Sequence, residues 1–208
     1  MARVGTVAGM HGSCAEAGVC ISFALHDKQS LFISGSKVDQ NTMKELLLSY
    51  AAFNAWANDQ LLQTIAATTP AQQEQELVSS FPTIRRTVLH LLDSNSIWWQ
   101  RIQLQEKIIR PSDAFEGDFA ALAKALRAVD NQWLEYVQRA QEHLFTHEFL
   151  YYDLKRQPQK SQVAQVLLHL FNHGTYHRGQ LVTMLRQVGV EKIPGTDFIL
   201  WSRKNKSL

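Results

Sequence analysis

Three histidines spaced four residues apart, His169, His173 and His177, lie in the largely apolar stretch LLHLFNHGTYHRGQLVTML. In an α-helix each residue turns by about 100°, so residues four apart lie on nearly the same side. The apolar residues of the stretch then place His173 and His177 on the buried side. A buried imidazole without a partner costs about 1 to 3 kcal/mol, whereas one metal ion would bind both rings. The pair therefore predicts a metal site.

A third ligand is expected from another helix, because two imidazoles alone hold a metal ion loosely. His90 is the candidate, since it lies among apolar residues in the stretch TVLHLLDSNSIWW. The predicted metal ligands are therefore His90, His173 and His177. His169 lies about 80° around the helix from His177, so the three histidines of this helix are poorly placed to bind one ion together. We expect His169 either to contact a metal-binding histidine or to be a packing residue. Asp93, one turn after His90, either orients a ligand imidazole or faces solvent.

The types of ligand at the predicted site limit which metal ions and which reactions it could support. HGTYH lacks the glutamate of the zinc-protease HExxH motif. None of the 8 histidines follows a glutamate by three residues, as the Glu-x-x-His ligands of di-iron bundles do. Three imidazoles without a carboxylate favour one divalent Zn, Ni or Fe(II) ion and leave coordination positions for water or substrate. Such an open site is typical of catalysis or ligand capture.

Long amphipathic helices are predicted to position these histidines. They span residues 42–66, 82–105, 116–143 and 162–188. In the first helix the stripe of residues at helical spacing is Leu46, Tyr50, Phe53, Ala57 and Leu61. In the third helix it is Phe119, Leu122, Leu126, Trp133 and Val137. Four helices of this length predict an all-α fold, a four-helix bundle.

Residues with special backbone preferences mark the ends of these helices. Asn41 or Thr42 can cap the first helix, and Pro82 suits the first turn of the second. Ser161 is the predicted cap of the fourth helix, and Gly189 ends it.

Two shorter segments lie outside the predicted helices. Residues 145–155 form either a short strand pair or an extended excursion. The tail, residues 190–204, carries Phe198 and Trp201 and is expected to pack back on the bundle.

The first 41 residues differ from the rest of the chain, because they are rich in Gly, Ala and Ser and show no sustained period. We expect residues 1–41 to be a disordered or extraneous appendage and residues 42–208 to be the bundle domain. Met43 is a candidate initiator, and the alternative is a genuine N-terminal extension. Both cysteines, Cys14 and Cys20, lie in the appendage, so the predicted domain has no cysteine nucleophile and no disulfide.

Composition excludes several classes of protein. A chain of 208 residues with 45% hydrophobic and 19% charged residues is typical of one globular domain. The net charge of +2 and the absence of a recognition motif argue against nucleic-acid binding. We find no apolar run of 18 residues and no secretory signal, so we expect no membrane span and a cytoplasmic location.

Four stretches of the chain resemble the DinB family. They are NAWANDQLL (54–62), FPTIRRTVLHLLDSNSIWWQRI (81–102), LLHLFNHGTYHRGQLVTMLRQVGV (167–190) and IPGTDFILW (193–201). The resemblance implies a four-helix bundle of DinB/YfiT type, with metal ligands at His90, His173 and His177. It also implies a homodimer and a link to stress response or to transfer of low-molecular-weight thiols. Asn95 departs from the family pattern, because many relatives carry an acidic residue there.

Three hypotheses of function follow. In the first, the chain is a metal-dependent transferase or hydrolase, and the metal binds a low-molecular-weight thiol as thiolate for attack on a small-molecule electrophile. In the second, it is a non-catalytic metal-binding protein of the stress response. In the third, the histidines only satisfy one another by hydrogen bonds.

Residues next to the predicted ligands have open roles. Tyr176 and Arg178 either contribute to the site or are helix-packing and surface groups, because neighbours in sequence point in different directions on a helix. Gly179 is expected to permit close approach of a second helix, and Gln180 to bond a neighbouring backbone.

Overall fold

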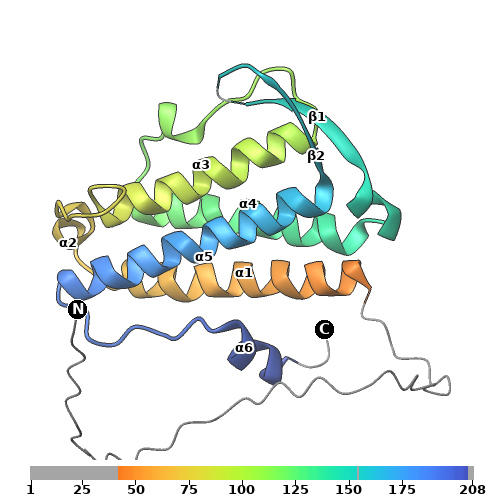
Figure 1. Ribbon diagram of the computed structural model, residues 1–208. Helices are drawn as coiled ribbons and strands as arrows, with labels where there is room; N and C mark the ends of the chain where they lie inside the picture. Colours follow the sequence, from red (N-terminus) through yellow and green to blue (C-terminus); the bar gives the residue numbers. More distant parts are fainter. Residues whose placement is uncertain (1–41, 154, 206–208) are drawn as a thin grey trace, which may run out of the picture. The chain divides into compact units, whose positions relative to one another are not determined.

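The computed structural model describes residues 42–153 and 155–205 (Figure 1). The appendage predicted for residues 1–41, with its two cysteines, lies outside the described residues. The long helices are α1 (Met43–Ala66), α3 (Ile84–Ile102), α4 (Phe119–Arg139) and α5 (Val163–Gln187). The shorter elements are α2 (Pro70–Glu74), η1 (Pro111–Asp113), η2 (Glu142–Thr146), β1 (Glu148–Tyr152), β2 (Pro158–Gln162) and α6 (Phe198–Lys204). The predicted all-α class is confirmed.

Capping residues set the helix starts, and two of them differ from the prediction. Thr42 caps α1 as expected, and its side chain accepts a hydrogen bond from the backbone of Glu45. Thr83 caps α3, so Pro82 precedes the cap and does not enter the first turn. Ser161 does not cap α5, because it belongs to strand β2 and pairs with Phe149 of β1. The following residue is the cap instead.

The four long helices form a bundle in which α1 and α3 each pack against both α4 and α5 (Figure 1). Near the starts of α3 and α4, Arg85 donates to the carbonyl of Gly117. Further along, Asn95 donates to Asp130, so α3 and α4 run in the same direction. The link between them, residues 103–118, must therefore return along α3. In contrast, α3 and α5 run antiparallel, since the start of α3 lies beside the end of α5.

Apolar side chains of all four helices fill the core. In α4 the five predicted core residues are all buried. In α1 the prediction was partly wrong, because Leu46 is exposed and Leu47 and Ala51 are buried instead. The helix presents a slightly rotated side to its partners, with Asn54 and Asn58 among its buried residues.

The hairpin and the tail both follow the sequence-based expectations. Strands β1 and β2 are antiparallel, which selects the strand pair over the extended excursion. Trp201 of α6 is buried, with its ring centroid 5.8 Å from that of Phe53 on α1. Within the described residues, no helix is both long and apolar enough to cross a membrane.

Candidate metal centre

The antiparallel packing of α3 on α5 brings the three predicted histidines together. The Nε2 atom of His173 lies 3.1 Å from Nε2 of His90 and 3.1 Å from Nε2 of His177. Among the described residues, these three form a group whose ligand atoms all lie within 4.8 Å of one another. Three ring nitrogens from two helices thus point at one small volume.

The spacing of the nitrogens fits a shared cation. With metal–nitrogen distances near 2.1 Å, two ligand nitrogens lie about 3.4 Å apart at a tetrahedral angle and about 3.0 Å apart at a right angle. The observed 3.1 Å falls between these values. Hydrogen bonding alone fits less well, because a neutral ring nitrogen carries either one proton or one lone pair. Nε2 of His173 can therefore satisfy only one of its two neighbours.

Gln180 fixes the orientation of one of these rings. Its Oε1 lies 2.8 Å from Nδ1 of His177, and its Nε2 donates to Oγ of Ser80 at 2.6 Å. Because an amide oxygen only accepts, Nδ1 of His177 carries the proton and Nε2 presents its lone pair to the other two histidines. The expected backbone bond of Gln180 was wrong. Its position one turn after a ligand was the signal that could have found this role.

Burial keeps the three rings neutral. It lowers the pKa of His90 and His173 to about 4, with the neighbouring His177 adding a smaller effect of the same sign. Burial also lowers the pKa of His177, while the bond to Gln180 opposes this. Phe81 stacks on the ring of His90 with the centroids 4.2 Å apart and covers it from one side. Near neutral pH all three therefore have the unprotonated form that binds metals.

The remaining polar atom of His173 is unusual. Its Nδ1 is buried and has no hydrogen-bond partner among the described residues. The ring of His173 is thus held in place by packing around Nδ1 and by the contacts of Nε2 with the other two histidines.

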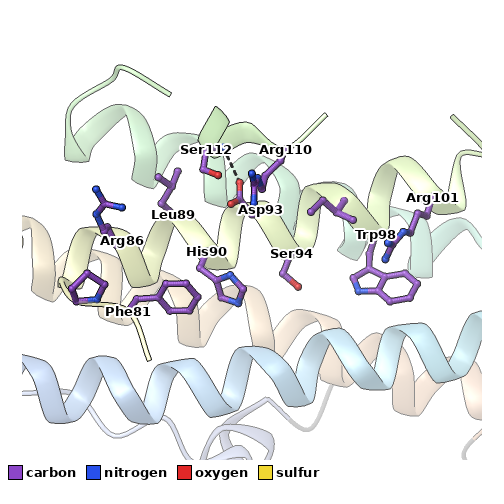
Figure 2. Close-up of a pocket in the computed structure, with 12 residues that line it drawn as sticks. Phe81, Arg86, Leu89, His90, Asp93, Ser94, Trp98, Arg101, Arg110 and Ser112 are labelled. Carbon is purple, nitrogen blue, oxygen red and sulfur yellow. Dashed lines mark hydrogen bonds between the residues drawn. The ribbon is translucent and has the colours of Figure 1, made fainter. Parts of the chain in front are cut away.

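His169 and Asp93 lie near the site without entering it. His169 packs edge-on against Trp98, with centroids 5.6 Å apart, and its ring centroid lies 5.8 Å from that of His173. Asp93 is buried and accepts a hydrogen bond of 2.8 Å from the backbone of Ser112 (Figure 2). It therefore neither orients a ligand imidazole nor faces solvent. It anchors the link that returns along α3.

Arg178 is buried between α5 and α1, which agrees with a helix-packing role and not with a surface one. Only 3% of it is exposed. Its Nη1 donates to Oδ1 of Asn54 at 2.7 Å and to Oδ1 of Asn58 at 2.9 Å, so it ties α5 to α1 directly behind the histidines. Tyr176, by contrast, is 59% exposed, in agreement with a surface role.

The network continues from Arg178 to a buried carboxylate. Asn58 and Asn95 donate to the two oxygens of Asp130, each at 2.8 Å. Burial raises the pKa of Asp130 to about 7, against the opposing effects of Asn58, Arg178 and Asn95. Asn95, which departs from the family pattern, thus serves as a donor to an acid on α4. Sequence reasoning missed this network, although the i,i+4 asparagines on the buried side of the first helix were a visible signal.

The close helix approach occurs at Gly174 and not at the predicted Gly179. A Cβ atom on Gly174 would lie 2.7 Å from Oδ1 of Asn54, whereas one on Gly179 would meet nothing within 4 Å. Gly174 therefore makes room for the bond between Arg178 and Asn54.

A cleft of about 380 Å³ lies along α3, and His90 is one of the residues that line it (Figure 2). His90, Ser94 and Trp98 project into it from one side of the helix. Of the three predicted metal ligands, His90 is the one that lines this cleft. Its other lining residues are Phe81, Pro82, Arg86, Leu89, Asp93, Ile97, Arg101, Arg110 and Ser112.

Comparison with known proteins agrees with the sequence motifs. The sequence profile of the DinB family matches residues 40–205 of this chain. The chain is also similar to the protein named Protein DinB of Bacillus subtilis (strain 168), with 28% identity over 164 residues. That alignment covers 76% of this chain and 95% of the Bacillus protein.

Proposed function

This chain belongs to the DinB family, and from that premise we propose that it is a metal-dependent enzyme acting on a small thiol. The proposed ligands are His90, His173 and His177, and the proposed cofactor is one divalent Zn, Ni or Fe ion. The observation that carries the proposal is the convergence of three Nε2 atoms, with separations of 3.1 Å at His173.

A divalent ion bound there would lower the pKa of a thiol or water in its open coordination positions. The chain itself supplies the rest of the site. Gln180 holds the protonated Nδ1 of His177, so that Nε2 is free to bind. The stacked ring of Phe81 limits access of water to His90. The cleft along α3 holds the second small molecule beside the thiol.

The proposed reaction is an S-transfer. The sulfur of a low-molecular-weight thiol forms a bond to an electrophilic carbon of a small molecule, and the thiol proton and the leaving group are released. The alternative, a non-catalytic metal-binding protein of the stress response, uses the same three histidines. By likeness to the family we also expect a homodimer.

The first test is metal content by elemental mass spectrometry of the untagged protein. We expect about one divalent ion per chain, lost in His90→Ala and in His173→Ala. His143→Ala is the matched control, because His143 is exposed and lies on η2. Absence of bound metal in the wild type, with no uptake of added Zn or Ni, would overturn the proposal.

A second measurement separates the enzyme from the non-catalytic alternative. Metal-loaded protein is assayed with several thiols against a set of electrophiles that carry a leaving group, such as activated aryl halides. Turnover that needs both the thiol and the three histidines supports the transferase. Metal binding without turnover across the set supports the alternative.

A further inference from the structure

Arg101, near the end of α3, is a buried cation that forms no ion pair with the described residues. It is 9% exposed, and its Nε atom is buried with no hydrogen-bond partner in the described part of the chain. It forms no ion pair with any carboxylate of residues 42–153 and 155–205. Its side chain lines the same cleft as His90 (Figure 2).

Two aromatic rings hold the guanidinium in place. Its Cζ lies 4.7 Å from the ring centroid of Trp98 and 5.2 Å from that of Tyr151 on β1. Cation–π contact compensates only part of the cost of removing a charge from water. The planar group is therefore fixed in position, and no carboxylate of the described residues forms an ion pair with it.

The nearest acid of the hairpin is already engaged. Asp153 accepts hydrogen bonds from the backbones of Lys155 at 2.8 Å and Gln157 at 2.9 Å. It also accepts one from Nε2 of Gln159 at 3.1 Å. These bonds shape the turn between the strands, and Asp153 forms no ion pair with Arg101. Its carboxylate is held by the turn and acts on Arg101 as a nearby charge without a direct ion pair.

The other arginines of the cleft differ from Arg101. Arg110 forms an ion pair with Asp113 at 2.7 Å, and Arg86 is exposed to solvent. Arg101 thus combines burial with the lack of an ion pair in the described part of the chain.

Arg101 also lies at a useful distance from the histidines. His90, Ser94 and Trp98 recur every four residues, and the guanidinium lies over the ring of Trp98. Eight residues of helix correspond to a rise of about 12 Å. A small molecule of about that length could contact both Arg101 and the histidine site.

We propose that Arg101 binds the carboxylate of a small organic acid that extends along the cleft toward His90. The planar fork of a guanidinium matches a carboxylate with two parallel hydrogen bonds, and the aromatic rings pre-organise it. The proposal deepens the proposed function and rests on it for the identity of the reacting end. The carboxylate belongs either to the thiol or to the electrophile.

The first experiment needs no metal, so that it is independent of the proposed function. Binding of octanoate and of octanol to the metal-free protein is measured by ligand-observed NMR. Octanoate is expected to bind wild type at least about tenfold more tightly than Arg101→Met, whose apolar side chain still covers Trp98. Octanol should bind both proteins equally. Arg139→Met is the matched control, because it removes the same charge from an exposed site on α4.

Arg101→Lys keeps the charge without the fork and should fall between wild type and Arg101→Met. It also serves if the methionine variant does not fold. Equal binding of octanoate to wild type and to the folded Arg101 variants would overturn the proposal. So would a wild type that binds octanoate no better than octanol.

A second experiment identifies the carboxylate's source. Protein loaded with Co(II) is titrated with mercaptooctanoate and with the uncharged mercaptooctanol, and the thiolate-to-cobalt absorption is followed. A preference of about tenfold for the charged thiol, lost in Arg101→Met, assigns the carboxylate to the thiol. Equal binding of both thiols, together with simultaneous binding of octanoate, assigns it to the electrophile. Failure to bind Co(II) would count against the metal site alone and would leave the octanoate result standing.

Discussion

The Nε2 atoms of His90 and His173 lie 3.1 Å apart, although the two residues are 83 positions apart in the chain and belong to different helices. This contact requires α3 and α5 to pack antiparallel at a fixed register. Thr87, one turn before His90, donates to the sulfur of Met184, two turns after His177, at 3.4 Å and so supports the antiparallel packing. The bundle thus pre-organises the site, and the rings need no rearrangement to share an ion.

Gln180→Leu is predicted to weaken metal binding by about 10- to 100-fold, because Nδ1 of His177 loses the acceptor that fixes its tautomer. Zn affinity, measured by competition with a chromophoric chelator, checks the prediction. Gln180→Glu retains an acceptor oxygen and should keep most of the affinity. An unchanged affinity in the leucine variant would show that His177 orients itself without Gln180.

Asp130→Asn is predicted to destabilise the protein by about 1 to 3 kcal/mol above pH 7, where the carboxylate is ionised. Asn58 and Asn95 both donate to Asp130, and an asparagine at this position offers one acceptor oxygen for two donors. The substitution also removes the negative charge of Asp130, which interacts with the buried Arg178. Urea unfolding measures the change.

The matched control for this variant is Asp59→Asn. Asp59 pairs with Arg127 at 2.6 Å, but both side chains are more than one third exposed. Loss of such a pair should cost less than about 1 kcal/mol. Equal effects of the two substitutions would mean that the buried network contributes no more than a surface ion pair.

Acidification is predicted to destabilise the metal-free protein more than its His90→Asn variant. The pKa of His90 falls from 6.5 to about 4 on folding, so the unfolded chain takes up this proton first. The resulting stabilisation is present above about pH 6.5 and is lost as the pH falls toward about 4. Urea unfolding across this range, with a chelator present, gives the difference. If the difference in free energy of unfolding between the two proteins did not change with pH, the pKa of His90 would be the same in the folded and unfolded states.

The helices and the histidine site were predictable because their signals are local. Apolar residues recur at helical spacing in α4, and His173 and His177 share a helix side by their separation alone. His90 could be named as a partner because it is a histidine among apolar residues. The register that brings His90 within 3.1 Å of His173 was not predictable, since it depends on packing across the whole bundle.

Helix packing was one of the roles expected for Arg178, but its partners could not be predicted from local signals. A charged residue beside a ligand is most often at the surface, and no local signal says that two asparagines of α1 lie opposite it. Only the parallel packing of α1 on α5 brings Asn54 and Asn58 within 2.9 Å of its guanidinium. The contact of Arg101 with Tyr151 could not be predicted either, because the hairpin that contains Tyr151 is distant in sequence.

Two glycines of α5 provide a final comparison, because the same substitution should have opposite effects at each. In Gly179→Ala the new methyl group meets no atom within 4 Å, and alanine favours the helix by about 0.5 to 1 kcal/mol. This variant should be more stable than wild type.

In Gly174→Ala the methyl group would lie 2.7 Å from Oδ1 of Asn54 and 3.0 Å from Nη1 of Arg178. Displacing either atom breaks their hydrogen bond, and the loss of about 1 to 3 kcal/mol should exceed the gain in helix propensity. Thermal unfolding of both variants measures whether each is more or less stable than wild type. Stabilisation by both substitutions would mean that α1 and α5 can separate at Gly174 without cost, and that the bond between Arg178 and Asn54 does not hold them together.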